Sequence, residues 1–473
     1  MLKLSRRKLF PMLAALLGLP RASQTSTMAE ENAFPAGFVW GASTSSYQIE
    51  GAVDADGRGK SIWDVFCHTP GKVKGGDTGD IACDHYHRWR EDVDLLTSDG
   101  FDAYRFSTAW PRILPAGSGV VEQRGLDFYD RLIDGLVARG IAPWLCLYHW
   151  DLPQALQDSG GWRHRDIAAK FADYASIVAR RLGDRVKHWA MFNEANVHAL
   201  FGHGIGSHAP GLTGLPSMLA AIHHQNLAQG QALQALRAER ADFRLGTVTN
   251  VQPTRPSSEA DVDRRAAELF DAYWNGAFLD PLFKGSYPAA IAENFTPLIA
   301  PGDLAAIKQP IDFLGLNYYA PMYIADAPQS LFGAWFGATP PGTRFTAFGW
   351  PIDAGGLTDA LHRVRDHYGN PEVYVTENGA CFDDPLAADG IVHDEDRIDY
   401  LRQHLAAARG ALAAGVKLRG YFVWSLLDNF EWAEGYSRRF GTIHVDFASE
   451  KRTPKASYRW LAEFIKRQKT GAQ

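Results

Sequence analysis

Two glutamates in this sequence directly follow short apolar runs, and their type and placement suit acid–base and nucleophilic chemistry. Residues 373–376 lead into Glu377, and residues 188–193 lead into Glu194. Buried parallel strands have this β-branched and aromatic composition, and in α/β barrels the reacting groups stand at the carboxyl ends of the strands. One such glutamate alone would be interpreted as a surface residue beyond a strand. Two of them favour the cleavage of a glycosidic bond, which requires one carboxyl as acid and one as nucleophile.

Polar and aromatic side chains also follow most of the other strand-like runs. Taken singly, Arg105 would be interpreted as part of a structural ion pair, and His149 as a core histidine whose hydrogen bonds are satisfied. Trp424 would be barrel packing, and Tyr319 would cap a strand. Their recurrence at one predicted edge instead favours a sugar site, because amides and carboxylates bind vicinal hydroxyls and indoles stack on pyranose faces. The candidates at this edge, besides the two glutamates, are Gln48, Arg105, His149, Trp150, Asn193, Tyr319, Trp424, Glu431 and Trp432.

These residues need a framework that brings distant parts of the chain to one edge. From residue 38 onward, strand-like runs alternate with helical patterns, which implies parallel strands joined by right-handed crossovers. Eight such units predict a single (β/α)8 TIM barrel. Asp166 is expected to cap one of its helices. Stretches rich in Gly, Pro and aromatic residues around 203–217 and 321–356 are predicted to be long rim loops. The expected strands are 38–42, 103–107, 143–148, 188–194, 244–250, 313–319, 373–379 and 420–426.

The composition argues against some functional classes, namely nucleic-acid binding and cysteine-based metal or redox sites. The chain has 473 residues, 46% of them hydrophobic, and a net charge of −6 from 48 basic and 54 acidic residues. No Lys/Arg run follows the first few residues, which argues against nucleic acid as a partner. The cysteines show no C-x-x-C spacing and no zinc-like grouping with histidine. Cys146 is expected to be buried, while a disulfide between Cys67 and Cys83 is left open.

The first residues have the order of an export signal. Lys3, Arg6, Arg7 and Lys8 precede an apolar run at 12–19, with small residues near Ala22. The paired arginines resemble a twin-arginine signal. Residues 1–27 are therefore predicted to direct export to the periplasm, and 34–467 to form the catalytic domain. A start at Met28 would leave the protein cytoplasmic. The apolar run is too short to span a bilayer, so no membrane contact of the mature form is expected.

The motifs along the chain resemble those of glycoside hydrolase family 1, the β-glucosidase family. They occur in family order between about residues 34 and 460, which makes the resemblance specific. The motifs are FVWGASTSSYQIEG at 38–51, YRFS at 104–107, WPRI at 110–113, YHWDLP at 148–153, NE at 193–194, NYY at 317–319, TENG at 376–379 and DNFEW at 428–432.

This resemblance implies a role for each site residue. Glu377 would be the nucleophile and Glu194 the acid/base, and Arg105 and Tyr319 would orient Glu377. Trp424 would be a stacking floor and Trp350 would face the aglycone. The sequence departs from the family pattern at Ala195, usually Pro, directly after Glu194, and at Met191, often Thr, two residues before Asn193. The residues implied to hold the glycone are Gln48, His149, Asn193, Glu431 and Trp432.

The activity implied is that of a retaining β-glucosidase acting on β-glucosides or short β-linked oligosaccharides, without a metal or organic cofactor. Three alternatives are considered. A 6-phospho-β-glucosidase would carry a Ser and a Lys in the stretch occupied here by residues 431–436, which contains Glu431 and Glu434 instead. A transglycosylase would use the same residues. A non-catalytic sugar-binding relative would normally lack one of the carboxyls, and both are present. The oligomeric state and the aglycone preference do not follow from the sequence.

Overall fold

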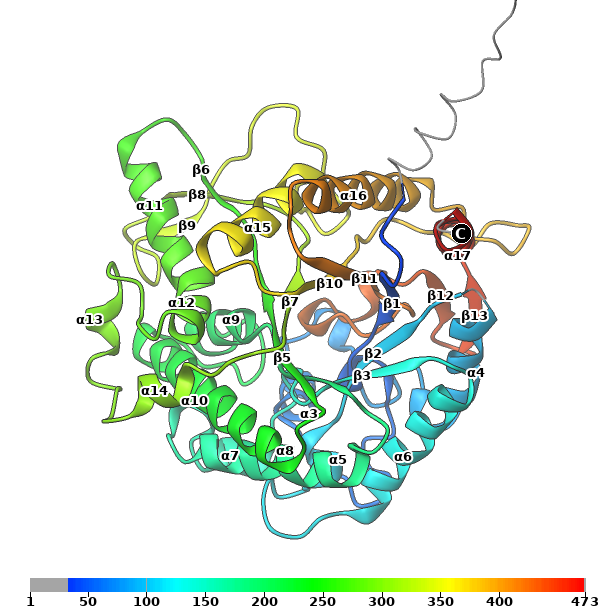
Figure 1. Cartoon of the computed structure of the whole chain (residues 1–473), viewed down its shortest axis with the longest axis horizontal. Helices are drawn as coiled ribbons and strands as arrows, with labels where there is room; N and C mark the ends of the chain where they lie inside the picture. Colours follow the sequence, from blue (N-terminus) through cyan, green and yellow to red (C-terminus); the bar gives the residue numbers. More distant parts are fainter. Residues whose placement is uncertain (1–32, 99, 472–473) are drawn as a thin grey trace, which may run out of the picture.

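Parallel strands close into a barrel at the centre of the molecule (Figure 1). The structure is a computed structural model that describes residues 33–98 and 100–471, so the predicted signal segment at 1–27 lies outside the described residues. Within the described chain the barrel has eight strands, in the order β1-β11-β10-β7-β5-β4-β3-β2, which confirms the (β/α)8 prediction. The strands are β1 (Val39–Ser43), β2 (Ala103–Ser107), β3 (Ala142–Cys146), β4 (His188–Asn193), β5 (Arg244–Asn250), β7 (Phe313–Asn317), β10 (Val373–Asn378) and β11 (Leu418–Trp424).

The strands are apolar because both of their faces are covered. Every residue of β2, β7 and β10 is buried, since the barrel interior lies on one side of each strand and the helices lie on the other. Three predicted strands end two residues earlier than expected, β3 at Cys146, β7 at Asn317 and β11 at Trp424. Tyr319 therefore lies in the loop after β7 and not in the strand, and His149 lies in the loop after β3.

Helices surround the barrel and cover its outer face (Figure 1). Asp166 stands at the N-cap position of α8, as predicted, but its side chain makes no cap hydrogen bond. Its own backbone is already helical (φ −62°, ψ −16°), so the side chain is not in the extended geometry from which it would reach the next amides. The main helices are α4 (His85–Ser98), α6 (Gln123–Ala138), α8 (Ile167–Leu182), α10 (Leu215–Glu239), α11 (Asp261–Asp271), α12 (Ala277–Phe283), α15 (Ala354–His367), α16 (Glu395–Ala413) and α17 (Ala456–Gly471).

Shorter elements lie in the connections. The short α-helices are α2 (Ser46–Ile49), α3 (Ile62–Cys67), α5 (Trp110–Ile113), α7 (Gln154–Asp158), α9 (Ala195–Val197), α13 (Ala292–Phe295) and α14 (Asp303–Ile307). Two π-helical segments, η3 (His198–Gly204) and η4 (Ala272–Gly276), flank the site described below. The 3-10 turns are η1 (Lys74–Gly76), η2 (Gly161–Arg163) and η5 (Trp432–Ser437), and β12 (Ile443–Asp446) pairs with β13 (Lys451–Pro454).

The two predicted rim loops contain more regular structure than expected. In the first, α10 already begins at Leu215. In the second, β8 (Met322–Asp326) pairs with β9 (Ala334–Phe336) and with β6 (Thr254–Pro256) outside the barrel, and α15 begins at Ala354. Strands of three to five residues among Gly and Pro carry too little alternation to be recognised from sequence.

One part of the core consists only of barrel-strand residues. It comprises Ala103, Trp144, Cys146, Ala190, Val248, Phe313, Tyr374 and Phe422 and includes the partly buried Val39 beside it, so the barrel below the rim is packed with side chains. The four cysteines are buried free thiols, so Cys67 and Cys83 form no disulfide, and Cys146 is buried as predicted. Across residues 33–98 and 100–471, every helix falls short of the length or apolar character that spanning a membrane demands.

Candidate active site

Glu377 lies at the rim on β10, and both of its carboxylate oxygens accept short hydrogen bonds. Arg105 on β2 donates from Nη1 to Oε1 at 2.6 Å. The Tyr319 hydroxyl, from the loop after β7, donates to Oε2 at 2.6 Å. Glu377 and Arg105 are each only 2% exposed, so water does not compete for the pair. These contacts fix the orientation of the carboxylate and favour its charged form.

Glu194 directly follows β4 and has a left-handed backbone conformation (φ 47°, ψ 55°). Its N–H donates to the Val248 carbonyl at 2.8 Å. Its carboxyl oxygen Oε1 accepts from Asn250 Nδ2 at 2.8 Å and from Asn317 Nδ2 at 2.9 Å. The departure at Ala195 therefore leaves Glu194 held by strand and amide contacts, and α9 begins at that alanine.

A continuous set of hydrogen bonds joins the two glutamates. Arg105, which binds Glu377, donates from Nη2 to Asn193 Oδ1 at 2.6 Å. Asn317 donates to the same Asn193 oxygen at 3.0 Å and also to Glu194. The orientation and the charge of one carboxyl are thus coupled to those of the other.

The two glutamates differ in how their surroundings affect the pKa. Burial raises the pKa of Glu194 to about 8, and the neighbouring Glu377 carboxylate adds to the effect. Burial also raises the pKa of Glu377, while Arg105 and the Tyr319 hydroxyl oppose the rise. The direction for Glu194 agrees with the expectation from the sequence. At neutral pH the arrangement supplies a protonated carboxyl beside one that is stabilised as a carboxylate.

Gln48 and Glu431 meet on the same rim. The Gln48 amide donates to Asn429 Oδ1 at 3.0 Å and approaches Glu431 Oε2 at 3.3 Å, and its oxygen accepts from the Ser45 hydroxyl at 2.6 Å. Burial, followed by repulsion from Glu377 and Glu194, raises the pKa of Glu431 to about 8. This third carboxyl therefore also favours its protonated form, a property that the sequence did not predict.

His149 packs with three tryptophans, Trp150, Trp424 and Trp432, at the same rim. The pKa of His149 is lowered far below its usual value by burial and by Arg105, so its imidazole is neutral, and Nε2 lies 3.0 Å from Asn193 Nδ2. The His149 ring centre lies 5.9 Å from that of Trp424 and 5.7 Å from that of Trp432. The Trp150 ring packs on Trp432 at 4.6 Å, and its indole N–H donates to the Asn193 carbonyl at 2.9 Å, so Trp150 supports this group of rings.

Trp350 lies on the Tyr319 side of the site. Its ring centre is 5.2 Å from that of Tyr319, and it packs in a small cluster with Phe348 and Phe440 that also includes Trp424. The structure thus brings the candidate site residues named from the sequence to one rim of the barrel.

Several polar residues that hold these groups in place were not assigned a role from the sequence. Asn317 was quoted only within a motif, yet it binds both Glu194 and Asn193. Asn250 is the last residue of β5, so the rule that polar residues at strand ends form the site applied to it as well. Ser45 and Asn429 orient Gln48, and each was likewise named only as part of a motif, at 38–51 and 428–432. In the described part of the chain, no three His, Cys, Asp or Glu side chains are grouped as metal ligands.

A parallel eight-stranded barrel whose rim holds two linked, buried carboxyls has the architecture of a (β/α)8 glycoside hydrolase. The sequence model of glycosyl hydrolase family 1 matches residues 30–470, and the chain belongs to that family. Beta-glucosidase A of Thermotoga maritima is 47% identical over 444 residues, covering 92% of this chain and 98% of the relative. A beta-glucosidase of an Agrobacterium species is 46% identical over 436 residues, covering 91% and 94%.

A solved structure is equally similar. The beta-glucosidase from Thermotoga maritima in complex with deoxynojirimycin superposes with a TM-score of 0.88 at 46% identity, covering 92% of this chain and 99% of that one. The prediction of family membership is confirmed.

Proposed function

We propose that this protein is a retaining β-glucosidase that releases terminal, non-reducing β-D-glucosyl residues from β-glucosides and short β-linked oligosaccharides. The proposal rests on the different hydrogen bonds and pKa shifts of two buried carboxyls, Glu377 and Glu194. Both oxygens of Glu377 accept short hydrogen bonds from Arg105 and Tyr319. Glu194 accepts amide hydrogen bonds on one oxygen and has a pKa of about 8. This is the division between nucleophile and acid that a double displacement requires.

In the first step a carboxylate oxygen of Glu377 attacks the anomeric carbon while the bond from that carbon to the glycosidic oxygen breaks. Glu194 gives its proton to the departing oxygen, so the aglycone leaves as a neutral alcohol. The product is a glycosyl ester on Glu377. Arg105 and Tyr319 are placed to hold the attacking group at a fixed angle and to stabilise its charge before attack.

In the second step the roles of the groups reverse. Esterification removes the negative charge of Glu377, which is the second cause of the raised Glu194 pKa. The pKa of Glu194 therefore falls, and its carboxylate takes a proton from water. The water oxygen attacks the anomeric carbon, and the ester bond to Glu377 breaks. Two inversions give net retention.

The glycone would be held by the polar residues of the rim. Gln48, Glu431 and neutral His149 offer donors and acceptors to the ring hydroxyls, and Asn193 lies between the two glutamates. Trp424 and Trp432 would stack on the sugar, and Trp350 would contact the aglycone. All of these side chains except the half-buried Trp350 are buried, which supports the assignment, since a sugar among them would be largely shielded from water.

The alternatives have less support. Glu434 lies where a 6-phosphate would need cations, and it already pairs with Lys74 at 3.1 Å and with Arg438 at 3.2 Å. A transglycosylase would share the chemistry and differ only in the acceptor. A non-catalytic relative would have no use for two carboxyls with such different surroundings.

The decisive experiment follows hydrolysis of an aryl β-glucoside by proton NMR. We expect β-glucose as the first product, before mutarotation, and expect the 6-phosphorylated substrate to react far more slowly. First release of α-glucose, or no turnover by pure folded protein, would overturn the proposal. Cellobiose at high concentration, with product analysis, would reveal any share of transfer to sugar acceptors.

We also propose export by a twin-arginine-type signal in residues 1–27, with 34–467 as the catalytic domain. The order of basic, apolar and small residues supports this. Mature protein from the native host should then begin after about Ala22 and lie in the periplasm. Intact Met1 or a start at Met28 in the cytosolic fraction would contradict it.

A further inference from the structure

The two oxygens of the Glu194 carboxyl have different surroundings. Oε1 accepts from Asn250 and from Asn317. Oε2 receives no hydrogen bond from the described part of the chain, and it is not among the buried side-chain atoms left without a partner. It therefore keeps some solvent-accessible surface. An amide N–H binds a bare carboxyl oxygen more strongly than a hydroxyl oxygen, so two amide donors on Oε1 direct the acidic proton to Oε2.

The orientation of the Asn317 amide is set by its other contacts. Its oxygen accepts from the Thr376 hydroxyl at 2.8 Å, and its nitrogen donates to Asn193 Oδ1 at 3.0 Å as well as to Glu194. Asn317 is fully buried. The Asn317 side chain thus binds both Glu194 and Asn193, whereas among the described residues the Asn250 side chain binds only Glu194.

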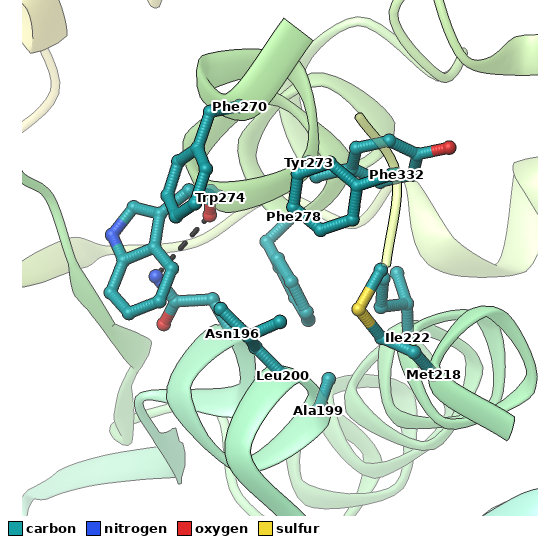
Figure 2. Close-up of a pocket in the computed structure, with 10 residues that line it drawn as sticks. All are labelled: Asn196, Ala199, Leu200, Met218, Ile222, Phe270, Tyr273, Trp274, Phe278 and Phe332. Atoms are coloured by element: carbon teal, nitrogen blue, oxygen red, sulfur yellow. Dashed lines mark hydrogen bonds between the residues drawn. The ribbon is translucent and has the colours of Figure 1, made fainter. Parts of the chain in front are cut away.

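The backbone of Asn250 is in turn bound by the side chain of Asn196. The Asn196 amide nitrogen donates to the Asn250 carbonyl at 2.8 Å and to the Trp274 carbonyl at 3.2 Å. Figure 2 shows the second of these bonds at the edge of a small pocket. Trp274 belongs to the π-helical segment η4, and Asn196 lies two residues before the π-helical segment η3. Asn196 is buried and its amide nitrogen donates to these two backbone carbonyls, so any effect on the site would pass through Asn250.

A small pocket lies beside Asn196. It has a volume of about 10 Å³ and is lined mainly by apolar side chains, among them Leu200, Met218 and Phe278 (Figure 2). A space of this size holds at most about one water molecule. On this side Asn196 therefore packs mainly against apolar side chains, and the carbonyls of Asn250 and Trp274 are the partners of its amide nitrogen.

We infer that Asn250 is a positioning residue for the acid/base Glu194. Together with Asn317 it directs the acidic proton of Glu194 to Oε2, and Asn196 holds Asn250 in place. The inference rests on the proposed role of Glu194. It assigns a function to two asparagines that need not touch the sugar. Loss of Asn250 should lower kcat/KM mainly for substrates whose leaving group needs a proton.

The test compares Asn250→Ala and Asn250→Asp with wild type on cellobiose and on 2,4-dinitrophenyl β-glucoside. We expect kcat/KM for cellobiose to fall about tenfold to hundredfold, because a hydrogen bond to an ionisable catalytic group is lost. For the dinitrophenyl substrate, whose phenolate leaves unassisted, it should fall less than about threefold. The Asn250 amide lowers the pKa of Glu194, so the basic limb of the pH profile should move to higher pH. The move should be larger for Asn250→Asp, which adds a negative charge.

Two further variants separate positioning from general stability. Asn196→Ala should shift the same quantities in the same direction but less, and should add little to Asn250→Ala, because both act through one contact. Asn275→Ala is the matched control: Asn275 is a fully buried asparagine in η4 whose amide binds Gln252 and Asp271, away from Glu194. It should leave the leaving-group ratio and the pH profile unchanged.

Equal losses on both substrates with an unmoved basic limb, in either Asn250 variant, would overturn the inference. Should Asn250→Ala not fold, the isosteric Asn250→Asp decides the matter alone. The proposed function is checked separately by Glu194→Ala with azide. If that variant gives the β-glycosyl azide while the Asn250 variants behave as wild type, only the inference fails. If it gives none, the role of Glu194 itself is wrong.

Discussion

Arg105 and Glu377 form a buried ion pair, with 2.6 Å between Nη1 of the arginine and Oε1 of the glutamate. The same guanidinium reaches Asn193, the residue before Glu194, through Nη2. One arginine thus contacts the proposed nucleophile and the strand end that carries the proposed acid. Its charge opposes the effect of burial on the Glu377 pKa, which keeps a carboxylate available in a pocket that would otherwise favour the neutral acid.

Replacing Arg105 with Met should therefore affect both charge and chemistry. We expect the pKa of Glu377 to rise, so that the acidic limb of kcat/KM moves to higher pH and kcat falls about 10²-fold to 10³-fold. An uncompensated buried carboxylate should also cost about 3–5 kcal/mol of stability near neutral pH, measured by denaturant unfolding. Arg363→Met, which breaks an ion pair with Asp271 on the outside of the barrel, is the control and should leave the pH profile unchanged.

Glu377→Ala should keep the fold and lose hydrolysis by about 10⁴-fold or more, because no covalent path remains. Azide should restore turnover of dinitrophenyl β-glucoside and give the α-glycosyl azide, since the small anion occupies the space of the missing carboxylate. NMR of the product identifies the anomer. Near wild-type activity in a pure preparation would refute the assignment.

Glu194→Ala should behave differently with different leaving groups. Cleavage of cellobiose should nearly cease, whereas glycosylation by dinitrophenyl β-glucoside should continue. Deglycosylation then limits the rate, so KM and kcat should fall together in steady-state measurements. Azide should accelerate this variant and give the β-glycosyl azide, the anomer opposite to that from Glu377→Ala. Equal loss on both substrates, without an azide product, would point to another carboxyl as the acid.

The raised pKa of Glu194 makes predictions for activity and stability. The basic limb of kcat/KM should lie near pH 8, since the acid must be protonated. Because the folded pKa exceeds the ordinary value of 4.5, the stabilising contribution is complete below about pH 4.5 and is lost as the pH rises through 8. Glu194→Gln should thus be more stable than wild type at pH 8 to 9 by on the order of a few kcal/mol, with little difference at pH 4.5. Urea unfolding at both pH values checks this.

Glu431 and Gln48 are expected to decide which sugar is accepted. Glu431→Gln or Gln48→Ala should cost about 2–4 kcal/mol of transition-state binding, because hydroxyls of the sugar lose their buried partners. The ratio of kcat/KM for nitrophenyl β-glucoside to that for the β-galactoside should change by more than about tenfold. A change confined to KM for different aglycones would show that the two residues do not bind the glycone.

The sequence alone determined the framework of this protein and the reacting groups. Alternating strand and helix patterns predicted the barrel because a parallel strand buried on both faces is apolar throughout. Glu377 and Glu194 could be identified because in such a barrel the strand's carboxyl end sets which residues reach the rim. The bounds of β3 and β7 were less certain, since nothing in residues 147–148 or 318–319 marks where pairing stops and the loop begins.

Only the tertiary structure decided how these groups act on one another. Asn250 and Asn317 are 67 residues apart in the chain, yet both donate to one oxygen of Glu194. Pairing of β5 with β7 brings the two asparagines together, and no local pattern encodes which amide hydrogen then points at which oxygen. The same holds for the pKa values. Burial and the distance between carboxyls raise the pKa of Glu194 and of Glu431, and both quantities exist only once strands from all parts of the chain have met.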